Sequence, residues 1–322
     1  MLIIRFSSLG DIILATPLLR NLKLKYPGIS LDFILKRQYQ NVLKNNPNIS
    51  KLYFYEKDKK NIEKLISDLK QENYDLVIDL QNNFRSAAIT KALDICTYKF
   101  NKRTLDKFLL VKFKINNLKD APQIPVRYAS VIPGINLEEE GLELIYPDHS
   151  SGLIRGKDKL IGFAPGSRHF TKMWPKEYYE RLGNLLLESG YNIVLLGGND
   201  DIQICADISG KIPGSINLCK EDNILQTAAD MKECKAVVCN DSGMMHTACA
   251  LKVPVMVFFG STVKEFGFTP YKNSNLILEN NSLTCRPCSH IGRERCPKGH
   301  FKCMLETGPE KAYEALIKFI EN

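Results

Sequence analysis

An apolar run that breaks into a polar turn is the part of this sequence with the clearest capacity for chemistry. The run occupies residues 237–239, and the polar residues at and after the turn are Asn240, Asp241, Ser242, Gly243 and His246. If a helix begins at this turn, its free N–H groups and positive end favour an anion, and Gly243 lets a ligand approach the backbone. The turn therefore predicts a phosphate-binding site. An isolated turn of this kind is more often a plain helix cap. The other motifs must therefore decide between a cap and a phosphate-binding site.

A second candidate anion site follows the apolar run at residues 160–164. Its residues with the relevant chemistry are Gly166, Ser167, Arg168 and Lys172. A glycine, a hydroxyl and two cations together resemble a phosphate cradle, and Lys172 could neutralise a diphosphate leaving group. The segment is neither a Walker-type phosphate loop nor a complete dinucleotide fingerprint, which argues against an NTPase or a dehydrogenase. The only tryptophan, Trp174, is expected to anchor the following helix in the core.

A candidate general base lies near the N-terminus, in the segment Ser7-Ser8-Leu9-Gly10-Asp11. The small residues Ser8 and Gly10 permit close approach to the backbone, and a helix N-terminus favours the carboxylate form of Asp11. An ionised aspartate can accept the proton of an alcohol. The competing interpretation, an ordinary helix N-cap, is slightly favoured by this segment alone.

A pair of glycines, Gly197 and Gly198, precedes Asn199, Asp200 and Asp201 after another apolar run. Asp200 could bind a ribose hydroxyl. The favoured interpretation is structural: the glycines form a turn, and Asp200 or Asp201 caps the next helix.

The elements that must position these residues alternate between strand and helix patterns. In the first half we expect strands at 2–6, 31–35, 52–55 and 76–80, and helices at 11–26, 61–71 and 84–93. In the second half we expect strands at 160–164, 193–196, 236–239 and 255–259, and helices at 176–188, 201–209, 224–232, 242–251 and 309–320. This alternation predicts parallel sheets with helices on both faces.

Sequence rich in proline, glycine and polar residues interrupts the alternation between residues 121 and 152. We therefore predict two Rossmann-like, doubly wound α/β domains, at 1–150 and 151–322, with a cysteine-rich segment at 285–303 and a terminal helix in the second. Two such domains would place a cleft between the carboxyl ends of their strands, where ligands bind.

The composition, with 44% hydrophobic and 25% charged residues in 322, is that of a soluble globular protein. The N-terminal residues lack the pattern of a secretory signal, and no stretch approaches the length of a membrane span. We expect a cytoplasmic protein with mostly reduced cysteines.

A basic run stands out from the net charge of +8. Between residues 99 and 119 only Asp106 is acidic, and the basic residues are Lys99, Lys102, Arg103, Lys107, Lys112, Lys114 and Lys119. Such a run is usually a solvated helix face. The alternative is a docking surface for an anionic partner, which could be nucleic acid, phospholipid or acidic glycan.

Four cysteines gather near the C-terminus, at Cys285, Cys288, Cys296 and Cys303. Their number suits a tetrahedral structural zinc site, although the second pair is spaced C-x₆-C instead of C-x₂-C. A disulfide pair and a loop of packed thiols are the competing interpretations. A catalytic zinc site is less favoured than a structural one.

Taken together, these motifs resemble one family. The matching segments are Ser7-Ser8-Leu9-Gly10-Asp11, Pro165-Gly166-Ser167 with Lys172 and Trp174-Pro175, and Asn240-Asp241-Ser242-Gly243 with His246. Their order over nearly the whole chain resembles the ADP-heptose:lipopolysaccharide heptosyltransferases of glycosyltransferase family nine. The cysteine segment, with Cys296-Pro297, Gly299-His300 and Cys303-Met304, is similar to the tail of the heptosyltransferase II branch.

The resemblance implies a glycosyltransferase B fold, with an N-terminal acceptor domain and a C-terminal nucleotide-sugar domain. It implies that Asp11, flanked by Ser8 and Gly10, is the general base and that Lys172 binds the diphosphate. Ser167 and Arg168 occupy positions where the family commonly has hydroxyl residues, so Arg168 is a departure. The residues implied around the diphosphate and sugar are Asp241, Ser242, Gly243 and His246.

The implied reaction is an inverting transfer of heptose from ADP-heptose to a hydroxyl of the lipopolysaccharide inner core. No cofactor is implied for catalysis, because the sequence offers no paired DxD carboxylates in a suitable loop. The implied partners are the nucleotide sugar, an anionic glycolipid acceptor and, by peripheral contact, the cytoplasmic face of the inner membrane, with no nucleic acid. A sugar-nucleotide epimerase of the same architecture, a family-nine transferase with another nucleotide sugar, and an inactive nucleotide-sugar-binding regulator are the alternatives.

Overall fold

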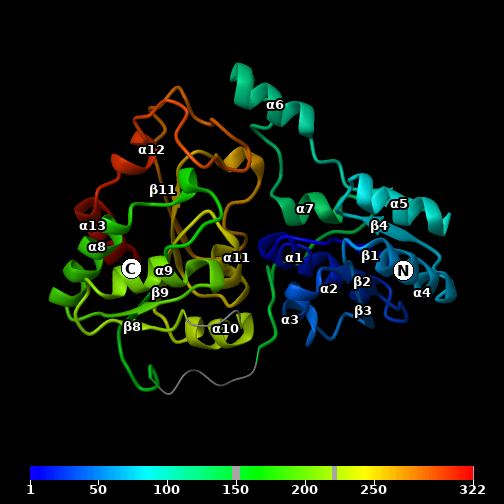
Figure 1. Ribbon diagram of the computed structural model, residues 1–322, viewed down its shortest axis with the longest axis horizontal. Helices are drawn as coiled ribbons and strands as arrows, with labels where there is room; N and C mark the ends of the chain where they lie inside the picture. The colour runs from blue at the N-terminus through cyan, green and yellow to red at the C-terminus, as the bar shows by residue number, and fades with distance from the viewer. Residues whose placement is uncertain (147–152, 220–222, 322) are drawn as a thin grey trace. The chain divides into compact units, whose positions relative to one another are not determined.

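The computed structural model describes residues 1–146, 153–219 and 223–321 and divides the chain into two compact units (Figure 1). Unit 1 comprises Met1–Arg103 and Pro122–Ile145, and unit 2 comprises Thr104–Ala121 and Tyr146–Asn322. The domain boundary expected between residues 150 and 151 lies outside the described residues. Residues 104–121, which we expected in the first domain, belong to unit 2.

Unit 1 contains a five-stranded parallel sheet in the order β3-β2-β1-β4-β5. Its strands are β1 (Leu2–Ile4), β2 (Asp32–Leu35), β3 (Lys51–Phe54), β4 (Val77–Asp79) and β5 (Thr97–Lys99). Its helices are α1 (Leu9–Ile13), α2 (Thr16–Lys25), α3 (Gln40–Leu43), α4 (Lys59–Gln71), α5 (Phe84–Leu93) and α7 (Ile124–Ala129), with a 3₁₀ turn at Arg37–Tyr39. The central strands β1, β2 and β4 are fully buried, as continuous apolar runs in a parallel sheet should be.

The long helix expected at 11–26 is two helices, because Pro17 interrupts it. A proline ring clashes with the carbonyl four residues before it, which here belongs to Ile13, the last residue of α1. The Thr16 hydroxyl donates to the Ile13 carbonyl instead, at 2.7 Å. The short α1 is therefore a separate element that holds Asp11.

Unit 2 contains a six-stranded parallel sheet in the order β11-β10-β9-β6-β7-β8. Its strands are β6 (Leu160–Ala164), β7 (Asn192–Leu195), β8 (Ile216–Asn217), β9 (Ala236–Asn240), β10 (Val255–Phe259) and β11 (Asn275–Glu279). Its helices are α6 (Thr104–Phe113), α8 (Lys176–Glu188), α9 (Ile202–Ser209), α10 (Ile224–Lys232), α11 (Gly243–Ala250), α12 (Lys302–Leu305) and α13 (Pro309–Glu321), with 3₁₀ turns at Phe170–Lys172, Asn199–Asp201 and Lys264–Phe266.

Helices cover both faces of the unit 2 sheet (Figure 1). One face shares a large apolar core with α8, α9 and α13, and α11 packs on β9 and β10 from the other side. The prediction of two doubly wound α/β domains is thus confirmed. Among the described residues, no helix has the length and apolar character needed to cross a bilayer.

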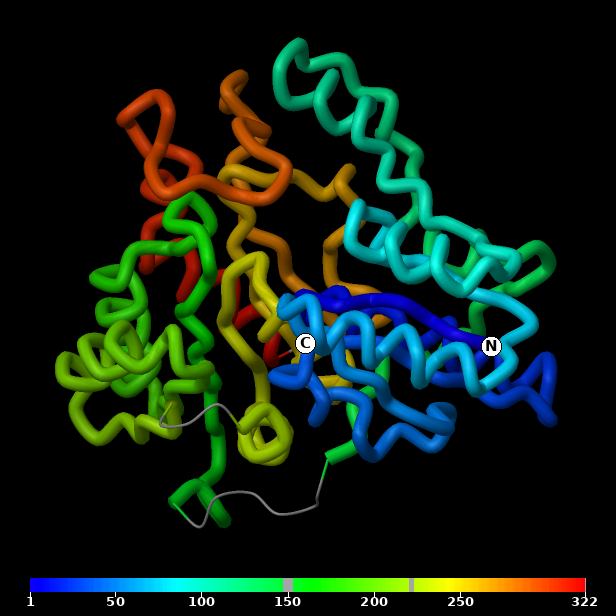
Figure 2. The backbone as a smooth tube through the Cα atoms, turned by 45° about the vertical axis from the view of Figure 1, so that its right-hand side comes forward, coloured from blue at the N-terminus to red at the C-terminus, as the bar shows by residue number. Residues whose placement is uncertain are grey.

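The segment Thr104–Ala121 packs on unit 2 through a small apolar cluster. Leu110 of α6 and Leu118 after it are buried together with Phe266. Figure 2 shows the course of this segment, in green-cyan, from a second direction. The expected basic run is therefore divided, because Lys99, Lys102 and Arg103 lie in unit 1 and the remainder in unit 2.

Candidate functional site

The carboxyl ends of β6 and β9 lie side by side in unit 2, where the order of the strands reverses. Crossover connections leave in opposite directions from such a point, and ligands of open α/β sheets bind there. The turn Phe170–Lys172 follows β6 and the N-terminus of α11 follows β9. Two of the anion-site motifs predicted from the sequence are therefore brought together.

Lys172 and Asp241 form an ion pair at this point. Lys172 Nζ lies 2.8 Å from Asp241 Oδ2, and both side chains are mostly buried. The Thr262 hydroxyl donates to the same oxygen, at 2.7 Å. Asp241 Oδ1 accepts no hydrogen bond from the described residues. Thr262 is not among the predicted site residues, and its one signal in the sequence is its place in the loop after the apolar strand β10.

Asn240 joins the loop after β6 to the loop after β9. Its side-chain amide donates to the Pro165 carbonyl at 2.7 Å and accepts the Trp174 N–H at 3.0 Å. The Trp174 ring is fully buried and stacks on Phe258, with the ring centroids 4.1 Å apart. The prediction that Trp174 is anchored in the core is thus confirmed. The same contacts fix the path of the chain just after Lys172.

Neither Asp241 nor Ser242 caps α11 through its side chain, so the turn at 240–243 is not a plain helix cap. Asp241 is bound to Lys172 and Thr262, and Ser242 is the N-cap residue but makes no side-chain cap. The Ser242 hydroxyl is buried and has no hydrogen-bond partner in the described structure. The first N–H groups of α11, which begins at Gly243, therefore keep their capacity to bind an anion. His246 is buried in the first turns of this helix.

The loop after β6 adds positive charge beside this helix end. Ser167 is half-buried and Arg168 is exposed. Burial, together with the nearby cations Lys172 and Arg168, lowers the pKa of His169. His169 is therefore neutral at neutral pH, and the positive charge of the loop comes from Arg168 and Lys172. This charge favours an anionic ligand.

The glycine turn at 197–198 is structural, as the favoured interpretation predicted. Asp201 accepts the Gly198 N–H at 3.0 Å, which caps the 3₁₀ turn Asn199–Asp201. A side chain on Gly166 would collide with the Asp201 carboxylate, so the two loops pack directly against each other.

In unit 1, Asp11 follows β1 and forms an ion pair with Arg5. Arg5 Nη2 lies 2.6 Å from Asp11 Oδ1, and Oδ2 accepts the Ser8 N–H at 3.0 Å and the Ser8 hydroxyl at 2.8 Å. Ser8 is thus the N-cap residue and Asp11 is the third residue of the helix, instead of the N-cap itself. Gly10 lies between them and is buried.

Burial alone would raise the pKa of Asp11, but Arg5 and the hydrogen bonds from Ser8 hold it below its ordinary value. The carboxylate is therefore ionised at neutral pH. Arg5 also donates to the Leu80 carbonyl at 2.8 Å, which fixes the guanidinium at the carboxyl ends of β1 and β4. Arg5 was missed in the sequence, where its signal is a cation at the end of an otherwise apolar strand.

A comparison with known families matches residues 62–298 to glycosyltransferase family 9, the heptosyltransferases. The match spans most of the chain and includes the Lys172 and Asp241 motifs. The chain belongs to this family. The predicted resemblance is therefore confirmed, and the chain is a glycosyltransferase.

Individual relatives agree with the assignment to glycosyltransferase family 9. The chain is 25% identical to lipooligosaccharide heptosyltransferase 2 of Haemophilus influenzae, and the alignment covers 99% of each protein. A solved family 9 glycosyltransferase of Veillonella parvula superposes with a TM-score of 0.80 at 21% identity, covering 99% of this chain and 96% of that one. The ADP-heptose lps heptosyltransferase II of E. coli gives 0.75 at 23% identity, covering 99% and 98%.

In this family 9 glycosyltransferase, Arg286 supports the loop that contains Thr262. The buried guanidinium forms an ion pair with Glu279 at 2.8 Å and donates to backbone carbonyls. The carbonyl acceptors are those of Phe259, Gly260, Thr262 and Asn280. Arg286 therefore fixes the chain between β10 and Thr262, and through Thr262 it positions Asp241.

We expect Arg286→Lys to destabilise the protein by about 3 kcal/mol, because lysine cannot satisfy so many buried carbonyls at once. The KM for the sugar donor should rise more than kcat falls, since the loop is loosened and the reacting groups remain. Arg181→Lys is the matched control, because Arg181 forms an exposed ion pair with Glu310. Equal unfolding midpoints of the two variants in urea would contradict this role.

The four cysteines of the segment 285–303 are free thiols. Burial, together with the neighbouring thiols, raises the pKa of Cys288 and raises that of Cys303 to about 11, so these groups are protonated at neutral pH. Cys285 Sγ lies 3.9 Å from His300 Nε2. Within residues 1–146, 153–219 and 223–321, no three His, Cys, Asp or Glu side chains are arranged to hold a metal ion.

Proposed function

We propose that this glycosyltransferase transfers a heptose from ADP-heptose to a hydroxyl of the lipopolysaccharide inner core, with inversion at the anomeric carbon. The observation that supports a nucleotide diphosphate sugar most directly is the Lys172–Asp241 pair beside the uncapped N-terminus of α11. The names of the relatives support heptose as the sugar and lipopolysaccharide as the acceptor.

The donor's diphosphate is bound by charge and by backbone N–H groups. Lys172 and the first N–H groups of α11 offset the negative charge that grows on the diphosphate as ADP leaves. Oδ1 of Asp241, which accepts no hydrogen bond from the described residues, accepts one from a hydroxyl of the sugar. The other side chains that we assign to the donor are Ser167, Arg168, Ser242 and His246, with Gly243 providing close backbone approach.

Asp11 is the general base. It takes the proton of the acceptor hydroxyl while the oxygen bonds to the anomeric carbon, and the bond from that carbon to the diphosphate oxygen breaks. Ser8 donates two hydrogen bonds to Oδ2, whereas Oδ1 is contacted by Arg5 at 2.6 Å. Oδ1 is therefore the oxygen that we assign to accept the proton, through the lone pair that does not face Arg5. Ser8 and Gly10 leave the backbone beside Asp11 open to the acceptor.

The acceptor in this proposal is an anionic glycolipid, and the enzyme acts in the cytoplasm in peripheral contact with the inner membrane. The acidic groups of such an acceptor suit the cations of unit 1 that lie after β5, Lys102 and Arg103. Burial, followed by the effect of Arg5, lowers the pKa of Lys102, so this amine lies in the same electrostatic field as Asp11.

Incubation of the protein with ADP-heptose and a truncated lipopolysaccharide acceptor tests the proposal. We expect ADP release that depends on the acceptor, and a product heavier by one heptose. An epimerase would instead convert the nucleotide sugar without an acceptor, and a regulator would bind ADP-heptose without turnover. Parallel reactions with other nucleotide sugars test the choice of heptose.

A structural zinc ion held by Cys285, Cys288, Cys296 and Cys303 is a separate hypothesis. The thiols lie near one another, but the loop must rearrange before three of them can share one ion. The hypothesis predicts one equivalent of zinc in protein purified under reducing conditions without chelator, and a lower unfolding temperature after zinc removal. Metal-free protein with unchanged stability would contradict it. Catalysis requires no cofactor in either case.

A further inference from the structure

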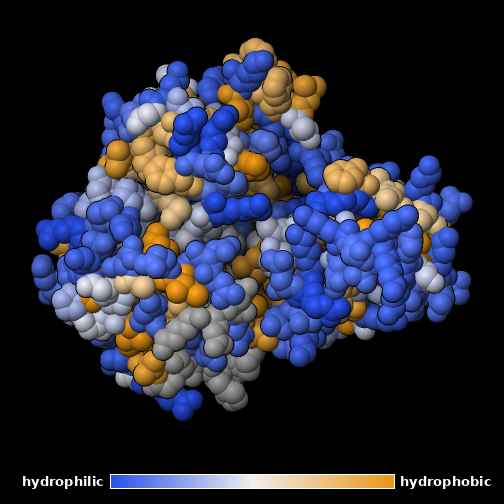
Figure 3. Space-filling view, in the orientation of Figure 1, coloured by the Kyte–Doolittle hydropathy of each residue, from blue (hydrophilic) through white to orange (hydrophobic). Residues whose placement is uncertain are grey.

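Helix α6 exposes apolar side chains on the side that faces away from the rest of unit 2. Among its residues, Leu105 is 69% exposed, Phe108 50% and Phe113 54%, and Ile115 just after the helix is 50% exposed. Figure 3 shows the corresponding hydrophobic atoms gathered at the top of the view, over the place of α6 in Figure 1. Burial of such a surface is favourable in proportion to its area, so a partner that covers it would be stabilised.

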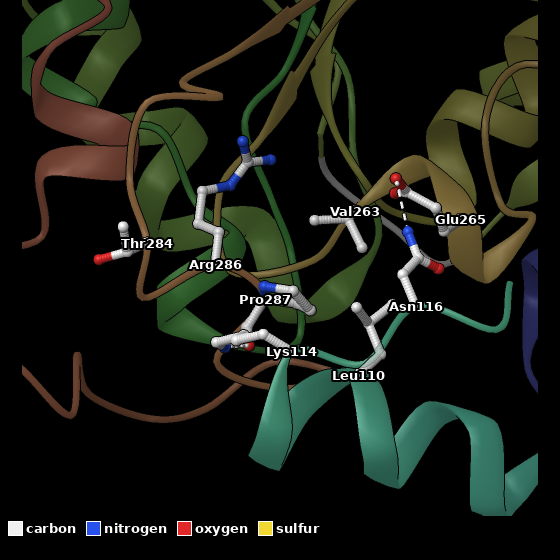
Figure 4. Close-up of a pocket in the computed structure, with 8 residues that line it drawn as sticks. All are labelled: Leu110, Lys114, Asn116, Val263, Glu265, Thr284, Arg286 and Pro287. Carbon is white, nitrogen blue, oxygen red and sulfur yellow. Dashed lines mark hydrogen bonds between the residues drawn. The ribbon is translucent and has the colours of Figure 1, made fainter. Parts of the chain in front are cut away.

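The opposite side of the α6 segment is attached to unit 2, so the exposed side does not result from an unpacked helix. Leu110 packs with Phe266, and Lys114 Nζ donates to the Pro287 carbonyl at 2.6 Å and to the Cys285 carbonyl at 3.2 Å. Figure 4 shows Leu110 and Lys114 pointing toward the loops of unit 2, and the hydrogen bond between Asn116 and Glu265. A pocket of about 390 Å³ lies between the segment and these loops.

Positive charge accompanies the exposed apolar side chains. Lys112 Nζ lies 5.4 Å from the centre of the Phe108 ring and 5.3 Å from that of Phe113, so the ammonium and both rings share one surface. The segment 104–121 contains only two acidic residues, Asp106 and Asp120. Lys107 and Lys114 lie on its attached side, where Lys107 Nζ is 5.8 Å from the centre of the Phe268 ring and Lys114 is bonded to carbonyls of unit 2. Aromatic and leucine side chains beside lysines are typical of helices that lie in a membrane interface.

We propose that α6 is a membrane-docking helix that inserts Leu105, Phe108, Phe113 and Ile115 among the lipids of an anionic bilayer. Lys112 would remain at the level of the lipid phosphates. This inference rests on the proposed function, in which the acceptor is embedded in a membrane. It favours an anionic bilayer over a second copy of this chain, whose own α6 would bring like charges together.

Binding of the full-length protein to sedimented vesicles tests the docking helix. The wild type should bind vesicles of mixed phosphatidylcholine and phosphatidylglycerol more tightly than vesicles of phosphatidylcholine alone. Leu105→Gln/Phe108→Gln should weaken binding by about tenfold or more, because the apolar contribution is lost. Lys112→Gln should weaken it by about fivefold.

The matched control is Leu24→Gln/Phe84→Gln, which removes the same side-chain types from exposed positions of unit 1, where they are 55% and 82% exposed. It should bind the mixed vesicles as the wild type does. Equal binding by both double variants would overturn the proposal. The proposal would also be overturned if the wild type did not bind vesicles and instead self-associated through α6. Self-association through α6 would appear as an oligomer that is lost in the Leu105→Gln/Phe108→Gln variant.

Activity assays separate this inference from the proposed function. Transfer to a water-soluble acceptor fragment should be the same in Leu105→Gln/Phe108→Gln and wild type, while transfer to an acceptor embedded in anionic vesicles should fall. If the wild type transfers no heptose to either acceptor, the proposed function fails, and vesicle sedimentation still decides whether α6 binds lipid. Equal loss with both acceptors would overturn the docking role.

Discussion

Asp11→Asn is expected to reduce kcat by about 10²–10⁴-fold, the usual contribution of a positioned general base. Asparagine keeps the shape of the side chain but cannot accept the proton of the acceptor hydroxyl. Donor binding should persist, because Lys172 and α11 belong to unit 2. Steady-state transfer rates and titration of ADP by calorimetry measure the two effects separately.

The same substitution should destabilise the protein, by about 3 kcal/mol at neutral pH, because Arg5 loses its buried partner. The folded-state pKa of Asp11 is lowered, so its stabilisation is fully present above the unfolded pKa of about 3.9 and is lost as the pH falls through the folded pKa. The stability difference between wild type and Asp11→Asn should therefore narrow in strongly acidic solution. Urea unfolding across this pH range measures it.

Ser8→Ala provides the matched control for the base. It removes one hydrogen bond to Asp11 Oδ2 and leaves the carboxylate paired with Arg5, so kcat should change by less than about tenfold. Transfer by Asp11→Asn at the wild-type rate, with ADP affinity also unchanged, would refute the assignment of the base.

Much of the core of the fold could be predicted because its pattern is local. The strands at 160–164 and 255–259 and the helices at 176–188 and 224–232 have the bounds that periodicity predicts. Buried strands of a parallel sheet are continuous apolar runs, and helices of this length show a clear period of 3.6. Of the four edge strands in the described sheets, β3 was predicted, at 52–55, and β5, β8 and β11 were missed. Two of these, β5 and β8, are short and partly polar, as edge strands often are.

The site could be predicted only where a motif follows a strand directly. Lys172 and Asp241 meet because β6 and β9 are neighbours in the sheet. The two motifs show that each residue follows a strand, but they do not show that these two strands are adjacent. Thr262 and Arg286 were missed because they act on residues 21 to 27 positions away along the chain. Arg5 pairs with the nearby Asp11, but the carbonyl that fixes its guanidinium, that of Leu80, is 75 positions away. The attachment of α6 to unit 2 escaped prediction for the same reason, since its partner Phe266 is distant in sequence.

Lys172→Met is expected to lower kcat/KM by about 10²–10³-fold, the usual loss when one charge-stabilising donor is removed from a developing anion. Methionine keeps the length and the apolar stem of lysine but cannot neutralise the diphosphate. The affinity for ADP should fall as well, because the product retains the charge that Lys172 offsets. Initial rates over a range of donor concentrations, together with ADP titration, give both quantities.

The matched control is Lys176→Met, which removes the same charge from another Lys–Asp pair in the same unit. Lys176 Nζ lies 2.7 Å from Asp207 Oδ2 in a partly exposed pair away from the strand ends of β6 and β9, so its loss should change neither transfer nor ADP affinity by more than about twofold. If the two variants lose activity equally, the effect is one of net charge, and Lys172 has no specific contact with the diphosphate.

A double variant distinguishes leaving-group stabilisation from folding. Lys172→Met leaves Asp241 as a buried carboxylate with Thr262 alone, which costs stability in addition to catalysis. Lys172→Met/Asp241→Asn removes that uncompensated charge, so its unfolding free energy should recover toward the wild-type value. Transfer should stay low, because the cation is still absent. Recovery of both stability and activity would mean that Lys172 serves only to neutralise Asp241, and the helix N-terminus would then be left as the principal group that binds the diphosphate.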